Sequence, residues 1–271
     1  MIFPIYKTEQ SLVVDQDPLW KWTKTFLIPC LVLMIFCPSI LFGQDATEIV
    51  TKAHEKMQGE QSLAEMTMQI IRPNWERSIS MKAWSMGEDF SMILVTAPAR
   101  DKGSAYLMRE NEIWNWIPNV NRTVKMPPSM MSQSWMGSDF SNNDLVRESS
   151  IVTDYTHTLL ADTTISEYDC YKIEMHPKPE APVVWSRVVT YISKDEYLQL
   201  RGEFYDEDDT LVRVMNGSDI KEMGGRLLPA RMEMNPVEES AKKTIITYQQ
   251  IDFDIDISEQ FFSIQNMKRL D

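Results

Sequence analysis

The sequence predicts a mainly β protein, with roughly ten to eleven strands forming one sandwich or barrel-like sheet. Three observations lead to this fold class. Apolar and polar residues alternate with a period of two in many short segments, as they do in half-buried strands. Turn residues separate these segments at short intervals, and no long linker divides the chain after residue 43. We therefore expect residues 44–271 to form a single domain.

One helix precedes the strands. From Asp45 to Gln58, the apolar residues Ile49, Ala53 and Met57 recur every four positions, which places them on one side of a helix. Gly59 follows and is expected to end it.

The early strands form a predicted antiparallel meander with one apolar face. Met66, Met68 and Ile70 alternate with polar residues, and Ile79 and Met81 continue this pattern after a turn at residues 72–74. Further strands of this meander are expected over residues 90–96, 105–108 and 112–117.

The segment Lys125–Arg147 breaks the alternation. Pro127-Pro128 ends any strand, so the apolar residues that follow are expected on loops or short helices. Exposed apolar side chains outside regular elements need a cover or a ligand. The most prominent of them are Met130, Met131, Trp135, Met136 and Phe140.

Alternation resumes in the second half of the chain. The predicted strands there cover residues 168–176, 183–193, 198–205, 210–219, 226–235 and 243–253. The acidic run Asp206–Asp209 is expected to be a solvated hairpin tip, because its spacing does not match the twelve-residue calcium loop.

Residues 1–43 are predicted to be a secretory signal peptide. Lys21 and Lys24 precede an apolar run from Phe26 to Phe42, and Gly43 separates that run from polar residues. The run is short for a membrane span and contains two prolines, although an uncleaved anchor is the alternative. Cleavage is expected after Gly43, and export through such a signal indicates a periplasmic protein.

Charge and composition exclude several classes of function. The net charge is −13, and the signal segment contains equal numbers of acidic and basic residues, so the acidity belongs to the mature part. This balance argues against nucleic-acid binding. The mature part keeps Cys170 as its single cysteine, and the chain has three histidines, so neither a disulfide, a zinc site nor any other cofactor is predicted.

Ser138, with Asp139 adjacent and His157 following, is a candidate for a hydrolase site. The surrounding Met-Gly-Ser-Asp sequence is not the Gly-x-Ser-x-Gly turn of the α/β hydrolases. The alternative is that Ser138 or Asp139 caps a short helix beginning near Phe140. The protein is therefore not expected to be an enzyme.

Several segments resemble the LolA-like outer-membrane lipoprotein-sorting protein family. The most specific is Trp135 to Ser141 with its Gly137, Ser138, Asp139 and Phe140, followed by Asp144-Leu145. Arg72-Pro73, Pro98 to Ala105, Trp114 to Pro118, Asn121 to Lys125 and Phe261 to Leu270 lie in the order that the family shows. The resemblance covers most of residues 45–271.

The resemblance implies an incomplete antiparallel β-barrel whose open side is closed by short helices. It implies a periplasmic carrier that shields the acyl chains of a lipoprotein or another lipid on the way to the outer membrane. The partners would be an inner-membrane exporter of the ABC or RND type and an outer-membrane acceptor, and we expect a monomer. The alternative is a sensing or partner-binding module of an exporter or signalling system.

The expected lining of an apolar cavity comes from the early strands and the irregular segment, although the sequence leaves open which strand face lines it. The same alternation, and the pair Trp114 and Trp116, also fit a plain core. Methionine is frequent, with 19 residues, and its flexible thioether suits adaptable binding surfaces. The candidate residues are Met66, Met68, Ile70, Ile79, Met81, Met92, Leu94, Trp114, Trp116, Met130, Met131, Trp135, Met136 and Phe140.

Overall fold

The computed structural model describes residues 45–110, 112–146, 150–181 and 183–270. The chain divides into two units, Met1–Gly43 and Gln44–Asp271, and all the described residues belong to the second. The predicted signal peptide lies outside the described residues. Among the residues that are described, no helix is long and apolar enough to span a membrane.

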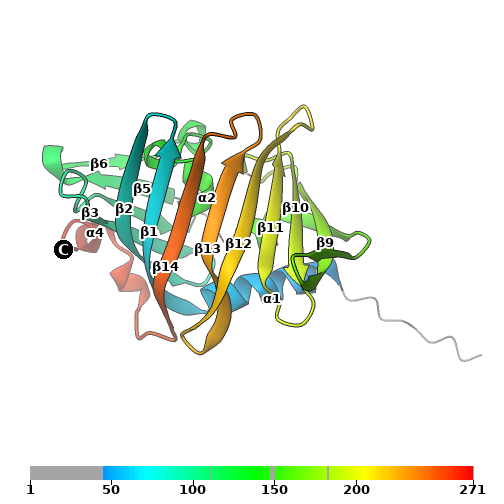
Figure 1. Ribbon diagram of the computed structural model, residues 1–271. Coiled ribbons are helices and arrows are strands. Elements are labelled where there is room, and N and C mark those ends of the chain that lie inside the picture. The colour runs from blue at the N-terminus through cyan, green and yellow to red at the C-terminus, as the bar shows by residue number, and fades with distance from the viewer. Residues whose placement is uncertain (1–44, 111, 147–149, 182, 271) are drawn as a thin grey trace, which may run out of the picture. The chain divides into compact units, whose positions relative to one another are not determined.

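The described residues contain fourteen strands in one antiparallel sheet. They are β1 (Gln61–Arg72), β2 (Trp75–Met86), β3 (Phe90–Ala97), β4 (Ala105–Arg109), β5 (Glu112–Ile117), β6 (Arg122–Lys125), β7 (Tyr155–Leu159), β8 (Thr163–Ile165), β9 (Tyr168–Pro177), β10 (Arg187–Ser193), β11 (Gln199–Tyr205), β12 (Leu211–Met223), β13 (Arg226–Pro236) and β14 (Lys243–Phe253). Their order is β6-β5-β4-β3-β2-β1-β14-β13-β12-β11-β10-β9-β7, and β8 pairs with β9. The pairing of β1 with β14 joins the two halves of the chain in the middle of the sheet (Figure 1).

The sheet is curved and does not close, so it has an inner and an outer face. The helices α1 (Ala46–Gln58) and α2 (Asn142–Val146) lie against the inner face, as their contacts with β10, β13, β3 and β4 indicate. Short helices α3 (Ser150–Thr153) and α4 (Ile264–Met267) and the 3₁₀ turns η1 (Pro118–Val120), η2 (Pro128–Met130), η3 (Trp135–Gly137) and η4 (Glu259–Phe261) complete the fold. The predicted incomplete antiparallel barrel with short helices is confirmed.

Helix α1 begins and ends as its sequence predicts. The Asp45 carboxylate accepts a hydrogen bond from the Thr47 N–H at 3.1 Å, which caps the first turn. Gly59 ends the helix with a left-handed φ of 66°, and its N–H donates to the Glu55 carbonyl. The apolar side of the helix, including Ile49 and Ala53, is buried against Tyr155, Ile173 and Trp185. Figure 1 shows this helix running beneath the later strands.

The outer face of β3 to β5 is covered by the C-terminal segment. Met92, Leu94 and Trp116 pack there with Phe262 and Met267, which are fully buried. The residues that alternate with them, such as Ile93 and Val95, face the inner core instead. This part of the sheet is therefore buried on both faces.

Three strands were not predicted. The eleven predicted segments each overlap a strand, but β6, β7 and β8 add three more. No strand was expected over residues 121–125, and four of them form β6 because they pair with β5 at the edge of the sheet. Strand β10 begins at Arg187 rather than at residue 183. Short edge strands depend on a partner strand more than on their own pattern.

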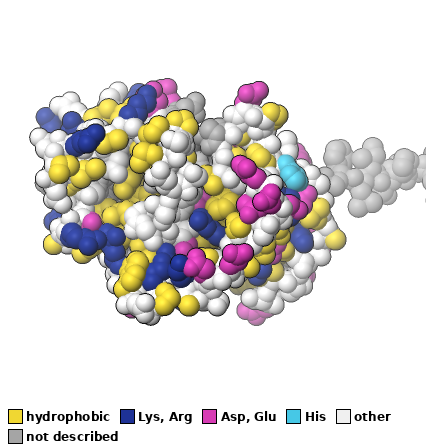
Figure 2. Space-filling view, turned by 90° about the horizontal axis from the view of Figure 1, so that it is seen from above, with side chains coloured by type: hydrophobic (Ala, Val, Ile, Leu, Met, Phe, Trp, Pro, Cys, Tyr) yellow, Lys and Arg dark blue, Asp and Glu magenta, His cyan; other side chains and the backbone are white. Residues whose placement is uncertain are grey.

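Charged side chains are unevenly distributed over the surface. Figure 2 shows Lys and Arg mainly on the left of the view and Asp and Glu mainly toward the right, with hydrophobic side chains scattered over the whole face. The negative net charge of the sequence is therefore not spread uniformly over this face.

Candidate functional site

A short irregular segment, Met130–Phe140, covers the inner face of the early strands, and we call it the lid. Trp135 is fully buried, and its ring centroid lies 5.3 Å from that of Tyr106. Met131 and Phe140 are also buried in the same cluster as Met68 and other inner residues of β1 and β2. Burial raises the pKa of Tyr106 to about 12, so its hydroxyl stays protonated at neutral pH. The lid therefore fills the inner face around Met68 and Tyr106 with side chains.

The lid has a defined backbone conformation. Met136 and Gly137 both have left-handed backbones, with φ values of 51° and 84°. The Trp135 N–H donates to the Phe140 carbonyl at 2.8 Å, and the Asn142 N–H donates to the Gln133 carbonyl at 2.9 Å. These bonds turn the chain back on itself between Gln133 and Asn142.

A buried ion pair anchors the lid to the sheet. The Arg72 guanidinium donates to both carboxylate oxygens of Asp139, at 2.9 and 3.1 Å, and to the Gly137 carbonyl at 2.9 Å. Thr244 on β14 donates its hydroxyl to Asp139 at 2.7 Å. The two charged side chains are only 11% and 8% exposed. Bidentate geometry and additional hydrogen bonds are what a buried pair requires to offset desolvation.

The Gly-Ser-Asp-Phe motif thus has a structural role at each position. Gly137 supplies the left-handed turn, Asp139 binds Arg72, and Phe140 enters the core. The Ser138 hydroxyl is 3.2 Å from both the N–H and the carbonyl oxygen of Phe140. The predicted cap of the following helix is not at Ser138 or Asp139 but at Ser141, which exchanges hydrogen bonds with Asp144.

Ser138, Asp139 and His157 do not form a catalytic triad. Ser138 is buried and bonded within its own turn, and the Asp139 carboxylate is bonded to Arg72 and Thr244. The ring nitrogens of His157 lie 2.8 Å from the Ile151 carbonyl and 3.3 Å from the Thr47 hydroxyl. A triad needs the base bonded to both the nucleophile and the acid. Across the described residues, moreover, no group of three or more His, Cys, Asp or Glu is placed to hold a metal ion.

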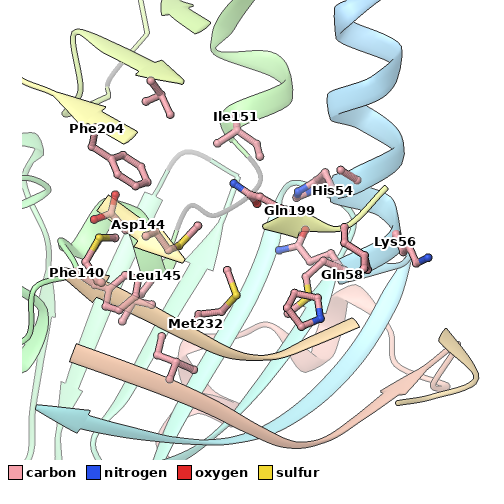
Figure 3. A pocket seen from close by; sticks show the side chains of 18 of the residues that line it. His54, Lys56, Gln58, Phe140, Asp144, Leu145, Ile151, Gln199, Phe204 and Met232 are labelled. Carbon is pink, nitrogen blue, oxygen red and sulfur yellow. The ribbon is translucent and has the colours of Figure 1, made fainter. Parts of the chain in front are cut away.

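A cavity of about 130 Å³ lies beside the lid, between the later strands, α1 and α2. Figure 3 shows Phe140, Asp144 and Leu145 on one side of it and His54, Lys56 and Gln58 of α1 on the other. Most of its wall is apolar. The apolar side chains that line it include Met57, Phe140, Leu145, Ile151, Met175, Trp185, Val188, Leu198, Phe204, Met215, Leu228, Met232, Met234 and Ile246.

Polar groups gather at the α1 end of the cavity. Lys56 forms an ion pair with Glu196 at 2.6 Å. Burial lowers the pKa of His54, against an opposing hydrogen bond with Gln58, so the imidazole is neutral at neutral pH. Beyond these residues lies an open, polar groove of about 740 Å³, which shares His54, Lys56, Gln58 and Tyr197 with the cavity. An apolar interior thus meets a polar surface groove at α1.

A second, smaller cavity of about 70 Å³ lies between α1 and the early strands. Its lining includes Met66 and Met81. The two cavities share Met57, Gln58, Leu145 and Tyr248, so these side chains separate one from the other.

The structure separates the predicted lining residues into two groups. Those of β1, β2 and the lid lie together on the inner face, namely Met66, Met68, Ile70, Ile79, Met81, Met130, Met131, Trp135, Met136 and Phe140. The second group lies on the outer face beneath the C-terminal segment and consists of Met92, Leu94, Trp114 and Trp116. Each of these residues alternates along its strand with residues that face the inner core. We leave these four out of the proposed lining.

The sequence interpretation missed the greater part of the cavity wall. Residues of β9 to β14 supply it, and their alternation was recognised only as a strand signal. Leu228, Met232 and Met234 on β13 repeat the Met-rich alternation of Met66 and Met68 on β1. This shared pattern was the sequence signal from which β13 could have been predicted to line the cavity.

Three solved structures resemble the chain in fold. A DUF1329 family protein from Desulfovibrio piger is 25% identical, with a TM-score of 0.75 over 82% of this chain and 97% of the other. A putative outer membrane lipoprotein-sorting protein domain from Vibrio parahaemolyticus is 21% identical, with a TM-score of 0.72 over 83% and 98%. A LolA superfamily protein from Nitrosomonas europaea is 21% identical, with a TM-score of 0.71 over 82% and 98%. The fold is therefore that of the LolA-like lipoprotein-sorting proteins, and the resemblance predicted from sequence is confirmed.

A family model described as "Uncharacterized protein" matches residues 87–269, which is more than half of the chain. The chain belongs to that family, whose match is consistent with the LolA-like fold. The comparison with curated proteins gives no match.

Proposed function

We propose that the protein is a periplasmic carrier that shields the acyl chain of a lipoprotein or another lipid during transfer toward the outer membrane. The observation that carries this proposal is the apolar cavity beside the lid, which shares His54, Lys56, Gln58 and Tyr197 with a polar groove at α1. The apolar part suits an acyl chain once the cavity has widened, and the groove suits the polar end of the ligand. The LolA-like fold supports the same function, and the predicted signal peptide supports the periplasmic location.

The energetics favour a carrier for such a cargo. Burying a methylene group stabilises the bound state by roughly 0.8 kcal/mol. Transfer of an acyl chain of about sixteen carbons from water into an apolar site is therefore favourable by on the order of 12 kcal/mol. A bare chain therefore leaves a membrane very slowly. A protein with an apolar interior lowers this barrier by providing an alternative site.

The cavity has to widen to hold a whole acyl chain. Its volume of about 130 Å³ is smaller than the roughly 300–1,000 Å³ of typical ligand pockets. Displacement of Leu145, Met57 and Tyr248 would join it to the second cavity under the early strands. Methionine side chains repack at small cost, which suits a cavity that expands.

Transfer also requires a donor and an acceptor. In this proposal, an inner-membrane exporter loads the protein and an outer-membrane acceptor with a more favourable groove receives the cargo. We propose a carrier rather than an enzyme, because the hydrogen bonds of Ser138 and Asp139 assign them to the lid and its anchor.

The decisive experiment is native mass spectrometry and lipid extraction of protein purified after export. We expect co-purifying acyl species and uptake of a fluorescent fatty acid. A protein that is repeatedly empty and takes up no fatty acid would contradict the proposal.

A pair of variants tests the location of the site. Met232→Glu places a charge in the cavity wall and is expected to reduce fatty-acid uptake at least tenfold, since an unpaired buried charge is costly. Gln69→Glu adds the same charge at an exposed position of β1 and should leave uptake unchanged. Equal uptake by both variants would place the acyl chain elsewhere.

A further inference from the structure

Asn143, at the lid end of the cavity, has an unusual side chain. It lies on α2, lines the cavity and is only 5% exposed. Its side-chain oxygen Oδ1 is buried and has no hydrogen-bond partner. The backbone of the residue is held in place, because its N–H donates to the Met131 carbonyl at 3.1 Å. The side-chain carbonyl of Asn143 is therefore a buried acceptor without a donor.

Such an acceptor is unfavourable in the empty protein. A buried polar group without a partner loses its hydrogen bonds to water and gains none in return. Other buried polar atoms without partners occur in the described part of the chain, on Arg77, Asn115, Thr123, Trp135, Thr190 and Arg213. None of those six residues lines the cavity, the second cavity or the groove. Asn143 therefore differs from them in being placed where a ligand can reach it.

The neighbouring polar group at this end is already engaged. The Asp144 carboxylate accepts hydrogen bonds from the Trp185 indole at 2.9 Å and from the Ser141 N–H at 2.7 Å. The surrounding wall is apolar, with Phe140, Leu145 and Phe204. His54 and Gln58 lie on the opposite side of the cavity, on α1 (Figure 3). At the lid end of the cavity, Asn143 thus adds a buried acceptor without a partner to a mainly apolar wall.

We propose that Asn143 gives the cavity a preference for acyl chains that carry a hydrogen-bond donor, either a hydroxyl or an amide N–H, within the buried part of the ligand. This inference rests on the proposed carrier function and adds a selectivity to it. A plain hydrocarbon chain leaves the Oδ1 acceptor unpaired, whereas a chain with a donor satisfies it. A hydrogen bond of this kind changes an equilibrium constant by about 2- to 10-fold.

The test compares three probes with backbones of fourteen atoms: tetradecanoate, 10-hydroxytetradecanoate and 9-(butanoylamino)nonanoate. The last two carry their donor at position 10, far from the carboxylate that the groove at α1 would hold. Each competes with a fluorescent fatty acid for the full-length exported protein. We expect the hydroxylated chain or the amide to bind about 2- to 10-fold more tightly than tetradecanoate, and the stronger of the two identifies which donor the site accepts. Equal affinities for the three probes would overturn the inference.

Variants then assign the preference to Asn143. Asn143→Leu keeps the size of the side chain and removes the acceptor, so the preference should disappear while tetradecanoate binds at least as well as before. Met232→Leu changes the apolar wall alone and should alter the three affinities by the same factor. A preference that persists in Asn143→Leu would also overturn the inference.

The two proposals fail in different ways. If tetradecanoate and both other probes fail to bind the wild-type protein, the carrier proposal is wrong, and the selectivity falls with it. If tetradecanoate binds but the other two show no advantage, the carrier proposal stands and the role of Asn143 is wrong.

Discussion

The two halves of the inner face have the same pattern of alternating apolar residues but different covers. The early strands are covered by the lid, whose side chains pack against Met68 and Ile79 without a cavity at those residues. The later strands are covered mainly by α1, and the larger cavity remains there. The smaller cavity under the early strands is also bordered by α1, through Met57 and Gln58. The comparison indicates that the covering segment, and not the strand pattern, determines where a LolA-like sheet leaves room for a ligand.

The largest effect is expected for Trp135→Ala, which removes the central side chain of the lid. Trp135 is fully buried, so its loss should lower the free energy of unfolding by about 3–5 kcal/mol, measured by urea denaturation. Trp75→Ala is the control, because Trp75 is 50% exposed and its loss should change stability by about 0.5 kcal/mol or less. Similar losses for both variants would mean that the lid is not packed as described.

A somewhat smaller effect is expected when the anchor of the lid is broken. Arg72→Met leaves the Asp139 carboxylate buried without its partner, which should cost about 3 kcal/mol and expose the lid to proteolysis. Lys82→Met breaks a more exposed ion pair between Lys82 on β2 and Glu65 on β1, and should cost about 1 kcal/mol or less. Equal sensitivity of the two variants to proteolysis would argue against the anchor.

A pair of Val→Leu substitutions compares the two halves directly. Val95 is fully buried in the packed half, so Val95→Leu should destabilise the protein by about 1–3 kcal/mol through overpacking. Val188 borders the cavity, so Val188→Leu should be tolerated at less than about 1 kcal/mol and should weaken fatty-acid uptake. Denaturant unfolding measures both losses. A larger loss of stability for Val188→Leu than for Val95→Leu would contradict the assignment of the free volume to the later strands.

The smallest effect concerns His54 at the mouth of the cavity. Burial lowers its pKa in the folded protein, so below its ordinary pKa of 6.5 the unfolded state binds a proton more readily. Stability should therefore fall as the pH drops below about 6.5. His54→Gln should reduce this fall, as measured by unfolding at pH 7.5 and pH 5. The decrease in stability that remains in this variant is due to groups such as His157, whose pKa is also lowered by burial.

The sequence allowed the fold class and most strands to be predicted because alternation and turns are local signals. Helix α1 was predicted with its terminal glycine for the same reason. Edge strand β6 was missed because four residues paired on one side carry too little pattern.

The site was harder to predict because it depends on contacts between distant segments. Arg72 and Asp139 are 67 positions apart, and no local pattern relates them. Met68 and Met232 occupy equivalent positions on alternating strands, yet one lies beneath the lid and the other lines the cavity. Whether Asn143 Oδ1 finds a hydrogen-bond donor depends on how the neighbouring donors are already paired, and only the folded structure determines this pairing.

The thioether groups in the cavity wall connect ligand binding to oxidation chemistry. Oxidation converts the apolar sulfur of methionine into a polar sulfoxide. Met215 and Met232 line the cavity and are only partly buried, so an oxidant that enters it reaches them more easily than fully buried Met68. A sulfoxide there would attract water into the space that the acyl chain needs. We therefore expect mild peroxide treatment to abolish fatty-acid uptake before it unfolds the protein, and methionine sulfoxide reduction to restore that uptake.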